Sequence, residues 1–231
     1  MRPMLVLAAT ALIGLTAGAR AATTDIEFAI TRDGDAIGTC SVHIVQTGSD
    51  VTVNTATSLE VKKLLVTLYR REQRSTERLA NGRLVAFRST TDDNGTKYQL
   101  DAALKGTVLE LTANGRATQI DRNLLPLSLW NAAVLRQSAG FDDMNGKVVP
   151  ITVTDRGVEE INTPERPIQA HRYTIEGVYK QDVWYDDQGR LVHVRFDVTR
   201  AGMTSTITYE LTSLRLDPAS TATASQPPKP K

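Results

Sequence analysis

Apolar and polar residues alternate along most of the chain between residues 26 and 211. A period of two predicts β-strands that pack one face and expose the other to water. Because the intervening positions are mostly Thr, Arg, Gln, Asp and Glu, the pattern is typical of antiparallel sheets with one wet face. The clearest apolar sets are Ile26/Phe28/Ile30, Val51/Val53, Tyr98/Leu100/Ala102/Leu104, Leu109/Leu111, Tyr173/Ile175, Val192/Val194/Phe196/Val198 and Ile207/Tyr209/Leu211.

Glycine-centred turns separate these segments. Asn-Gly pairs stand at 81–82, 94–95, 114–115 and 145–146, and Asn-Gly favours the type I′ turn of a two-residue hairpin. The spacing predicts about ten to twelve strands. The expected fold class is therefore mainly β, a strongly curved antiparallel sheet or half-open barrel with one short packed helix.

The short helix is expected between Ser128 and Gln137. Trp130 and Val134 are four positions apart there, Ser128 can cap the start, and Gly140 follows as a stop.

The stretch from Glu60 to Arg78 fits either a helical stripe or a long strand, and periodicity alone does not decide between them. We favour a strand with a bulge near Lys62-Lys63, because such a strand forms a hairpin across Asn81-Gly82.

The N-terminus carries an export signal. Arg2 precedes a short apolar run over 4–15, and Ala19-Arg20-Ala21 matches an A-x-A cleavage site. The run is shorter than the roughly 20 residues of a membrane-spanning helix. We therefore expect residues 1–21 to be a signal peptide, 22–216 a single β-rich domain and 217–231 a disordered tail. This predicts a periplasmic or secreted protein that is not an integral membrane protein.

Charge points away from nucleic acid as the expected partner. Loss of the leader removes Arg2 and Arg20 from the 27 basic residues and leaves all 26 acidic residues, so the mature chain has a formal charge of −1. A balanced charge favours neither nucleic acid nor a strongly anionic membrane. Basic residues do gather between Lys62 and Arg78, but Glu60, Glu72 and Glu77 are interspersed. A solvated edge strand is therefore favoured over a site for anionic head groups or polysaccharide.

The chain has one cysteine, Cys40, which excludes an intramolecular disulfide and metal sites built on paired cysteines. Cys40 alternates with Val42 and Ile44, so we expect a buried, unreactive thiol. The other interpretation is an exposed thiol that links two copies of the protein.

The segment from Val183 to Leu191 predicts a hairpin. Asp187-Gln188 suits the corner and Gly189 the left-handed bulge position. The expected register pairs Tyr185 with Leu191 and Trp184 with Val192. Trp184 would then join the apolar face with Val194 and Phe196, while Tyr185, His193 and Arg195 would share the other face.

Motifs for catalysis and metal binding are absent from the sequence. The three histidines have no metal-ligand spacing, and neither a G-x-S-x-G elbow nor a glycine-rich phosphate loop occurs. We therefore name no catalytic residue, metal ligand or cofactor, and the balance leans against an enzyme. His171 alternates with Tyr173 and Ile175, so it is either a hydrogen-bonded core residue or a polar contact inside a ligand cavity.

The order of several short motifs resembles a family of exported bacterial proteins described only as a domain of unknown function. The resemblance covers nearly the whole mature chain and implies a periplasmic protein with a curved antiparallel sheet, similar in outline to the half-open barrels of outer-membrane lipoprotein carriers. It implies neither an activity nor catalytic residues. The motifs are Asp33-Gly34-Asp35-Ala36-Ile37-Gly38, Tyr69 and Glu77 before Asn81-Gly82-Arg83-Leu84, Ser128-Leu129-Trp130-Asn131, and Trp184-Tyr185-Asp186 with Gly189-Arg190-Leu191.

The leading functional hypothesis is a non-enzymatic protein that binds a lipid or other apolar or amphipathic ligand, or an envelope protein, on the concave side of its sheet. One alternative is a hydrolase acting on envelope lipid or polymer, which needs a clustered acid–base pair with perturbed pKa values. Another is a structural or interaction module without a small-molecule ligand, which needs a flat apolar patch. The candidate ligand-binding residues, all of which also fit an ordinary core, are Trp130, His171, Tyr173, Trp184 and Tyr209.

Overall fold

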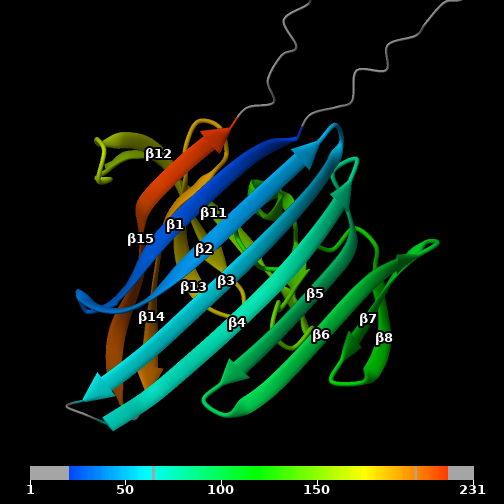
Figure 1. Ribbon diagram of the computed structural model, residues 1–231, viewed down its shortest axis with the longest axis horizontal. Coiled ribbons are helices and arrows are strands. Elements are labelled where there is room, and N and C mark those ends of the chain that lie inside the picture. The colour runs from blue at the N-terminus through cyan, green and yellow to red at the C-terminus, as the bar shows by residue number, and fades with distance from the viewer. Residues whose placement is uncertain (1–20, 64–65, 201, 218–231) are drawn as a thin grey trace, which may run out of the picture.

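The structure is a computed structural model that describes residues 21–63, 66–200 and 202–217. The predicted leader and tail lie almost entirely outside the described residues. The elements along the chain (Figure 1) are β1 (Ala22–Arg32), β2 (Asp35–Thr47), β3 (Asp50–Lys63), β4 (Val66–Ala80), β5 (Arg83–Asp93), β6 (Thr96–Lys105), β7 (Val108–Ala113), β8 (Arg116–Asp121), the 3₁₀ helix η1 (Ala132–Arg136), β9 (Ala139–Phe141), β10 (Val148–Pro150), β11 (Thr152–Ile161), β12 (Ile168–Glu176), β13 (Lys180–Tyr185), β14 (Leu191–Arg200) and β15 (Met203–Asp217).

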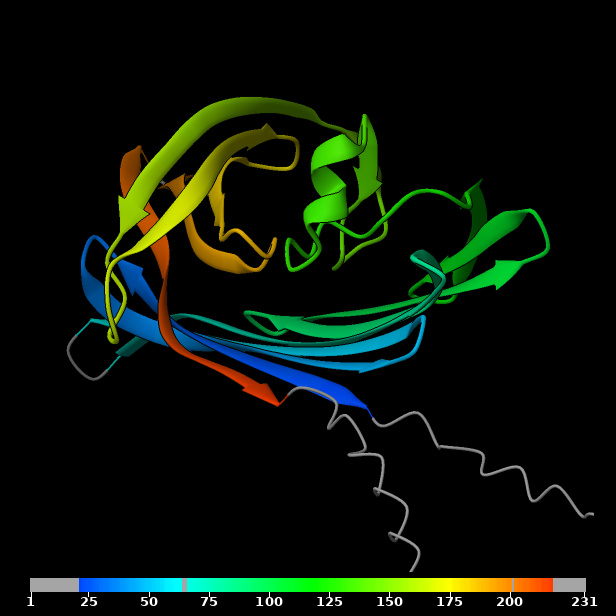
Figure 2. The same ribbon diagram turned by 90° about the horizontal axis from the view of Figure 1, so that it is seen from above.

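Thirteen of these strands form one antiparallel sheet in the order β11-β12-β13-β14-β15-β1-β2-β3-β4-β5-β6-β7-β8. Neighbours are consecutive in the chain except at β15 and β1, where the last strand pairs with the first. Seen from above, the sheet curls around the segment that connects β8 to β11 (Figure 2). The mainly β, antiparallel prediction is confirmed, with more strands than the ten to twelve expected.

The connecting segment, residues 122–151, is called the cover segment below. It contains η1 and the separate β9–β10 pair, and it lies inside the curl of the sheet (Figure 2). The expected helix is a five-residue 3₁₀ helix capped by Asn131 instead of Ser128. Leu129 has a left-handed backbone with φ of 66°, which stops a helix from starting at Ser128.

Residues 60–63 and 66–78 are extended, so the preference for strand over helix is confirmed for the described part of this stretch. A register shift lies between Val61 and Lys62, close to the expected bulge, and β4 and β5 form the hairpin across Asn81-Gly82. A single long strand was wrong, because β3 ends at Lys63 and β4 begins at Val66. Residues 64–65 lie outside the described part of the chain.

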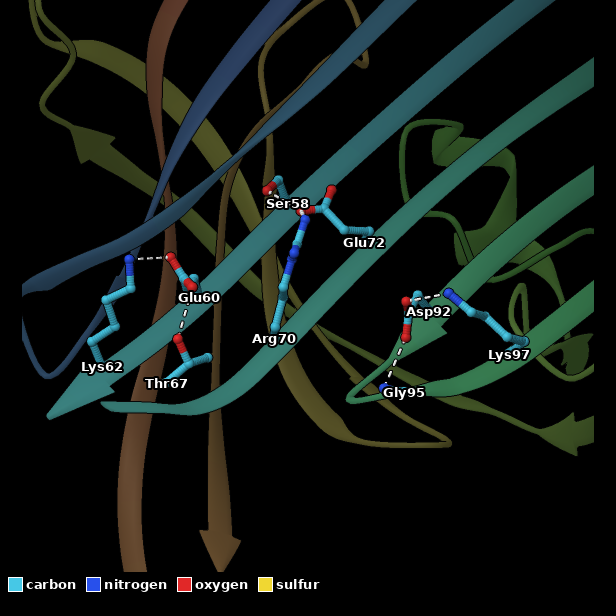
Figure 3. Close-up of polar contacts among 9 residues, drawn as sticks. All are labelled: Ser58, Glu60, Lys62, Thr67, Arg70, Glu72, Asp92, Gly95 and Lys97. Atoms are coloured by element: carbon cyan, nitrogen blue, oxygen red, sulfur yellow. Dashed lines mark hydrogen bonds and ion pairs between the residues drawn. The ribbon is translucent and has the colours of Figure 1, made fainter. Parts of the chain in front are cut away.

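The edge-strand assignment for the basic stretch was also wrong, because β4 lies between β3 and β5 within the sheet. Several outward charges on β3 to β6 are paired with neighbours (Figure 3). Lys62 Nζ lies 2.6 Å from a Glu60 carboxylate oxygen, and Arg70 Nη2 lies 3.3 Å from Glu72. Lys97 on β6 likewise pairs with Asp92 on β5. On this part of the outer face, positive and negative side chains are therefore interspersed.

Three of the four Asn-Gly pairs close hairpins as expected. Asn81, Asn94 and Asn114 and the glycines that follow them all have positive φ, which is the type I′ conformation. The fourth pair, Asn145-Gly146, lies in the longer loop between β9 and β10, where only the glycine has positive φ. A longer loop does not require the two consecutive left-handed residues of the tight turn.

The core consists of two apolar clusters on the inner face. The larger one includes Phe28, Val53 and Val183, and the smaller one includes Phe87 and Leu100. Val51 and Trp130 pack against both. Cys40 is buried and free in the larger cluster, as expected, and burial raises the pKa of its thiol to about 11.

The register predicted for Trp184 was wrong by one position. Tyr185 pairs with Leu191, but Trp184 pairs with His193, because Val192 is the extra residue of the bulge. Trp184 therefore lies on the outer face with His193, and Tyr185 lies on the inner face. Trp184 is nevertheless only 4% exposed. The two groups that cover the ring are the Arg172 guanidinium, 5.2 Å from the ring centroid, and the Glu159 carboxylate, which accepts the Nε1–H bond.

Candidate ligand-binding site

A groove of about 590 Å³ lies between η1 and the inner face of β12 and β13. Its walls combine aromatic and aliphatic side chains, and polar groups of the β13–β14 turn complete it. We call it the His171–Tyr173 groove. The residues that line it are Ala132, Leu135, Arg136, Val158, Gln169, Ala170, His171, Tyr173, Tyr185, Asp186, Asp187 and Gly189.

Alternation along β12 places His171 and Tyr173 on the same face, where their rings stack with centroids 4.5 Å apart. Strand β11 brings Asp155 opposite Tyr173. Its Oδ1 lies 2.6 Å from His171 Nε2, and this hydrogen bond lowers the pKa of Asp155. The His171 side chain is 36% exposed. His171 is therefore hydrogen-bonded, as in the core interpretation, but half-exposed at a groove.

Tyr185 separates the groove from the interior of the sheet. The residue is 2% exposed, and its hydroxyl donates to the Leu129 carbonyl at 2.7 Å. Burial raises the pKa of Tyr185 far above its usual value. The bond ties β13 to the cover segment and holds η1 against the groove.

A second hollow, the interior cavity, lies deeper between the sheet and the cover segment and has a volume of about 170 Å³. Its polar side comes from β3 and β4 and from the β9–β10 loop, and includes Thr55, Arg71, Gln73 and Asp143. Its apolar side includes Phe28, Val42, Ile175 and Phe196, and Tyr209 also lines it.

Strand β4 supplies a row of inward polar residues that the sequence reasoning did not single out. Gln73, Ser75 and Glu77 are all at least 91% buried, while Arg74 and Arg78 on the alternate positions are exposed. The signal was present as strict alternation, since Arg71, Gln73, Ser75 and Glu77 occupy every second position. Because basic residues occupy both faces of this strand, their charge alone does not reveal the inward polar row.

The β9–β10 loop holds Asp143 at the cavity. Asp142 Oδ1 accepts the backbone N–H bonds of Met144 and Asn145, both at 2.9 Å, and this shapes the loop. Ser89 Oγ donates to the Asp143 carbonyl at 2.5 Å and fastens the loop to β5. The Asp143 side chain then shares the cavity with Arg71.

Two buried carboxyl groups have raised pKa values. Burial raises the pKa of Glu77 to about 7, although Ser128 and Trp130 beside it favour the charged form. Burial also raises the pKa of Asp143 to about 6, against the opposing charge of Arg71. The pKa of Arg71 is raised because the charge of Asp143 and neighbouring tyrosines outweighs the opposing effect of burial.

The structure separates the five candidate residues. His171 and Tyr173 line the groove, and Tyr209 lines the interior cavity. Trp130 packs between the two apolar clusters beside Glu77. Trp184 lies on the opposite face of the sheet and touches neither hollow. Neither hollow is lined by all five residues, and their assignment to a ligand site stays a prediction.

Within the described residues, no group of three or more His, Cys, Asp and Glu side chains is arranged to hold a metal ion. None of the helices among those residues combines the length and apolar character of a membrane-spanning helix.

Comparison with known proteins identifies a family without an assigned activity. The model of the family described as "Domain of unknown function (DUF6134)" matches residues 28–212, most of the chain. None of the curated proteins matches the sequence.

A solved structure shares the fold. The chain is similar to the β-barrel-like protein of the domain of unknown function DUF1849 from Brucella abortus, with a TM-score of 0.61 and 11% sequence identity. The similarity covers 86% of this chain and 98% of the other. At this identity the comparison establishes a β-barrel-like fold and no activity.

Proposed function

The chain belongs to the DUF6134 family of domains of unknown function, and we propose that it is an exported protein that binds an amphipathic ligand, such as a lipid, in the His171–Tyr173 groove. The observation that carries the proposal is the groove itself. Its volume of about 590 Å³ lies within the roughly 300–1,000 Å³ typical of small-molecule sites. Apolar walls next to fixed polar groups are also typical of such sites.

The side chains of the groove suit a ligand with an apolar chain and a polar head. Tyr173 and Leu135 offer apolar surface, and Val158 at the same groove is 62% exposed. Covering such surface with an acyl chain removes apolar area from water and favours binding. Arg136 and the His171–Asp155 pair offer charged and hydrogen-bonding partners for a head group.

Export is supported by the sequence of residues 1–21, which combines a basic start, a short apolar run and an A-x-A site. A periplasmic or secreted location would place the groove where envelope lipids occur.

The test is a displacement assay with a fluorescent fatty acid on the wild type, His171→Phe and His43→Phe. His43 is a matched control, because its Nδ1 contacts Asp25 Oδ1 at 2.5 Å on another part of the sheet. We expect saturable binding by the wild type and weaker binding by His171→Phe, by about 0.5–1.5 kcal/mol, the usual net contribution of one hydrogen bond. His43→Phe should bind as the wild type does.

Two results would contradict the proposal. Equal binding by both variants would remove His171 from the site, and an absence of saturable binding by the wild type would favour the structural-module hypothesis. Thermal melts of all three proteins distinguish lost binding from lost folding.

The raised pKa values of Glu77 and Asp143 are the observation that favours the alternative of a hydrolase. An acid–base pair must, however, reach the reacting atoms of the substrate. Asp143 lines the interior cavity, but Glu77 is buried beneath Ser128 and Trp130 and does not line it. Only one of the two carboxyl groups can therefore touch a ligand, which favours binding over hydrolysis.

A further inference from the structure

The interior cavity holds two opposite charges that do not meet. Arg71 on β4 and Asp143 on the β9–β10 loop both line it. Among the described residues, no ion pair within 4.0 Å joins them. Arg71 Nη2 instead donates to Gln73 Oε1 at 2.7 Å. Arg71 and Asp143 are partly buried and shift each other's pKa, but no direct ion pair between them offsets the desolvation of the two groups.

Other polar atoms at the same cavity are also unpaired. Arg71 Nε, Gln73 Nε2 and Thr55 Oγ1 are buried and have no hydrogen-bond partner. Gln73 is only 9% exposed and lines the cavity. Buried donors without partners are rare in folded proteins, because each costs about 1–3 kcal/mol. A polar molecule that enters the cavity can supply the missing hydrogen bonds.

The volume of the interior cavity and its apolar side limit the kind of molecule that can bind there. Water occupies about 30 Å³ per molecule in the liquid, so about 170 Å³ corresponds to roughly six waters or one small organic molecule. Phe28, Val42 and Phe196 form an apolar side of the cavity next to the polar groups, since Val42 pairs with Thr55 across β2 and β3, and these three side chains offer waters no hydrogen-bond partners. Val178 and Tyr179, which are 42% and 48% exposed, also line the cavity and mark its opening to solvent.

We infer that the interior cavity binds a small zwitterion, an α-amino acid with a short apolar side chain, whose carboxylate contacts Arg71 and whose ammonium group contacts Asp143. Guanidinium groups are well suited to carboxylates, and a carboxylate is the matching partner for an ammonium group. The short apolar side chain fits the wall formed by Phe28, Val42 and Phe196. A ligand with only one charge would leave either Arg71 or Asp143 buried and unpaired. This inference uses a different cavity from the proposed function and does not depend on it.

The test compares three ligands by calorimetry on exhaustively dialysed protein. Valine carries both charges, isovalerate lacks the ammonium group and isobutylamine lacks the carboxylate, while all three share the same apolar end. We expect valine to bind at least about tenfold more tightly than either analogue. Equal affinity for an analogue would show a singly charged ligand class, and an absence of heat with all three at millimolar concentration would show a cavity filled by water. Both results overturn the inference.

Two variants test which residue binds the carboxylate of valine and which binds its ammonium group. Arg71→Met should lower the affinity for valine to that for isobutylamine, and Asp143→Asn should lower it to that for isovalerate. The controls Arg74→Met and Asp101→Asn change residues on the outer face and should bind valine as the wild type does. Circular dichroism melts report folding, and if Arg71→Met does not fold, Asp143→Asn carries the test. Valine binding unchanged in a folded Asp143→Asn would contradict the assignment.

Discussion

At the scale of single residues, one step along a strand decides whether a charge is solvated or buried. Arg70 and Glu72 point outward from β4 and form an exposed pair, which contributes little to stability (Figure 3). Arg71 and Glu77, on the alternate positions, point inward and have shifted pKa values. The same residue types therefore serve solubility on one face and, on the other, create a polar strip inside an otherwise apolar core.

The raised pKa of Glu77 predicts that stability falls as pH rises. Between pH 4.5 and about 7 the native carboxyl keeps a proton that the unfolded chain has released, so rising pH favours unfolding. Glu77→Gln should abolish this loss. Above pH 7 it should gain up to roughly 3 kcal/mol over the wild type, the equivalent of the shift in pKa.

The measurement is denaturant unfolding at several pH values. Asp143 acts with the same sign around pH 3.8 to 6 in both proteins, so the difference between the profiles of the wild type and Glu77→Gln isolates Glu77. Glu72→Gln, on the outer face of the same strand, is the control and should keep the wild-type pH profile. A Glu77→Gln profile parallel to that of the wild type between pH 6 and 7 would refute the prediction.

At the scale of elements, the first hairpin explains the glycines of the D-G-x-x-I-G motif. Asp33 and Gly34 both have positive φ and form the turn between β1 and β2. Gly38 has a different role, because β2 and β3 approach closely there. A Cβ atom at this position would lie 2.0 Å from the Ser58 carbonyl oxygen on β3.

Gly38→Ala should therefore destabilise the protein by roughly 1–3 kcal/mol, the usual cost of overpacking. The obstacle is backbone of the paired strand, so no side-chain rotation relieves the contact. Thr39→Ala on the exposed next position is the control and should change the free energy of unfolding far less. Chemical denaturation of both variants provides the comparison, and an unchanged midpoint for Gly38→Ala would show that the two strands separate easily.

At the scale of the whole molecule, the pairing of β15 with β1 joins the two ends of the chain in the middle of the sheet. The cover segment then fills the concave side. Phe141, fully buried in that segment, packs edge-on against Phe87 of β5 with ring centroids 5.5 Å apart. Because Val51 and Trp130 contact both apolar clusters, the clusters share part of their packing.

Shared packing predicts that the described strands unfold as one cooperative unit. The chain has two tryptophans, so Trp130→Phe leaves Trp184, buried on the outer face of β13, as the sole tryptophan that reports on the part of the sheet carrying the larger cluster. Far-UV circular dichroism reports both clusters at once. We expect the two signals to give the same denaturation midpoint in Trp130→Phe, and a single dichroism transition in the wild type. Separate midpoints would show two independently folding parts and would contradict the single domain expected for residues 22–216.

The sequence alone was sufficient for the properties that depend on neighbouring residues. Alternation predicted the antiparallel strands and the burial of Cys40, and Asn-Gly pairs located three tight turns, because side-chain direction and positive φ are local properties of the backbone. Tertiary structure decided the rest. The bulge at Val192 reversed the face of Trp184, since a shift of one residue moves every later side chain to the other side. Arg71 and Asp143, 72 positions apart in the sequence, share a cavity only because the cover segment folds back onto β4 and β5.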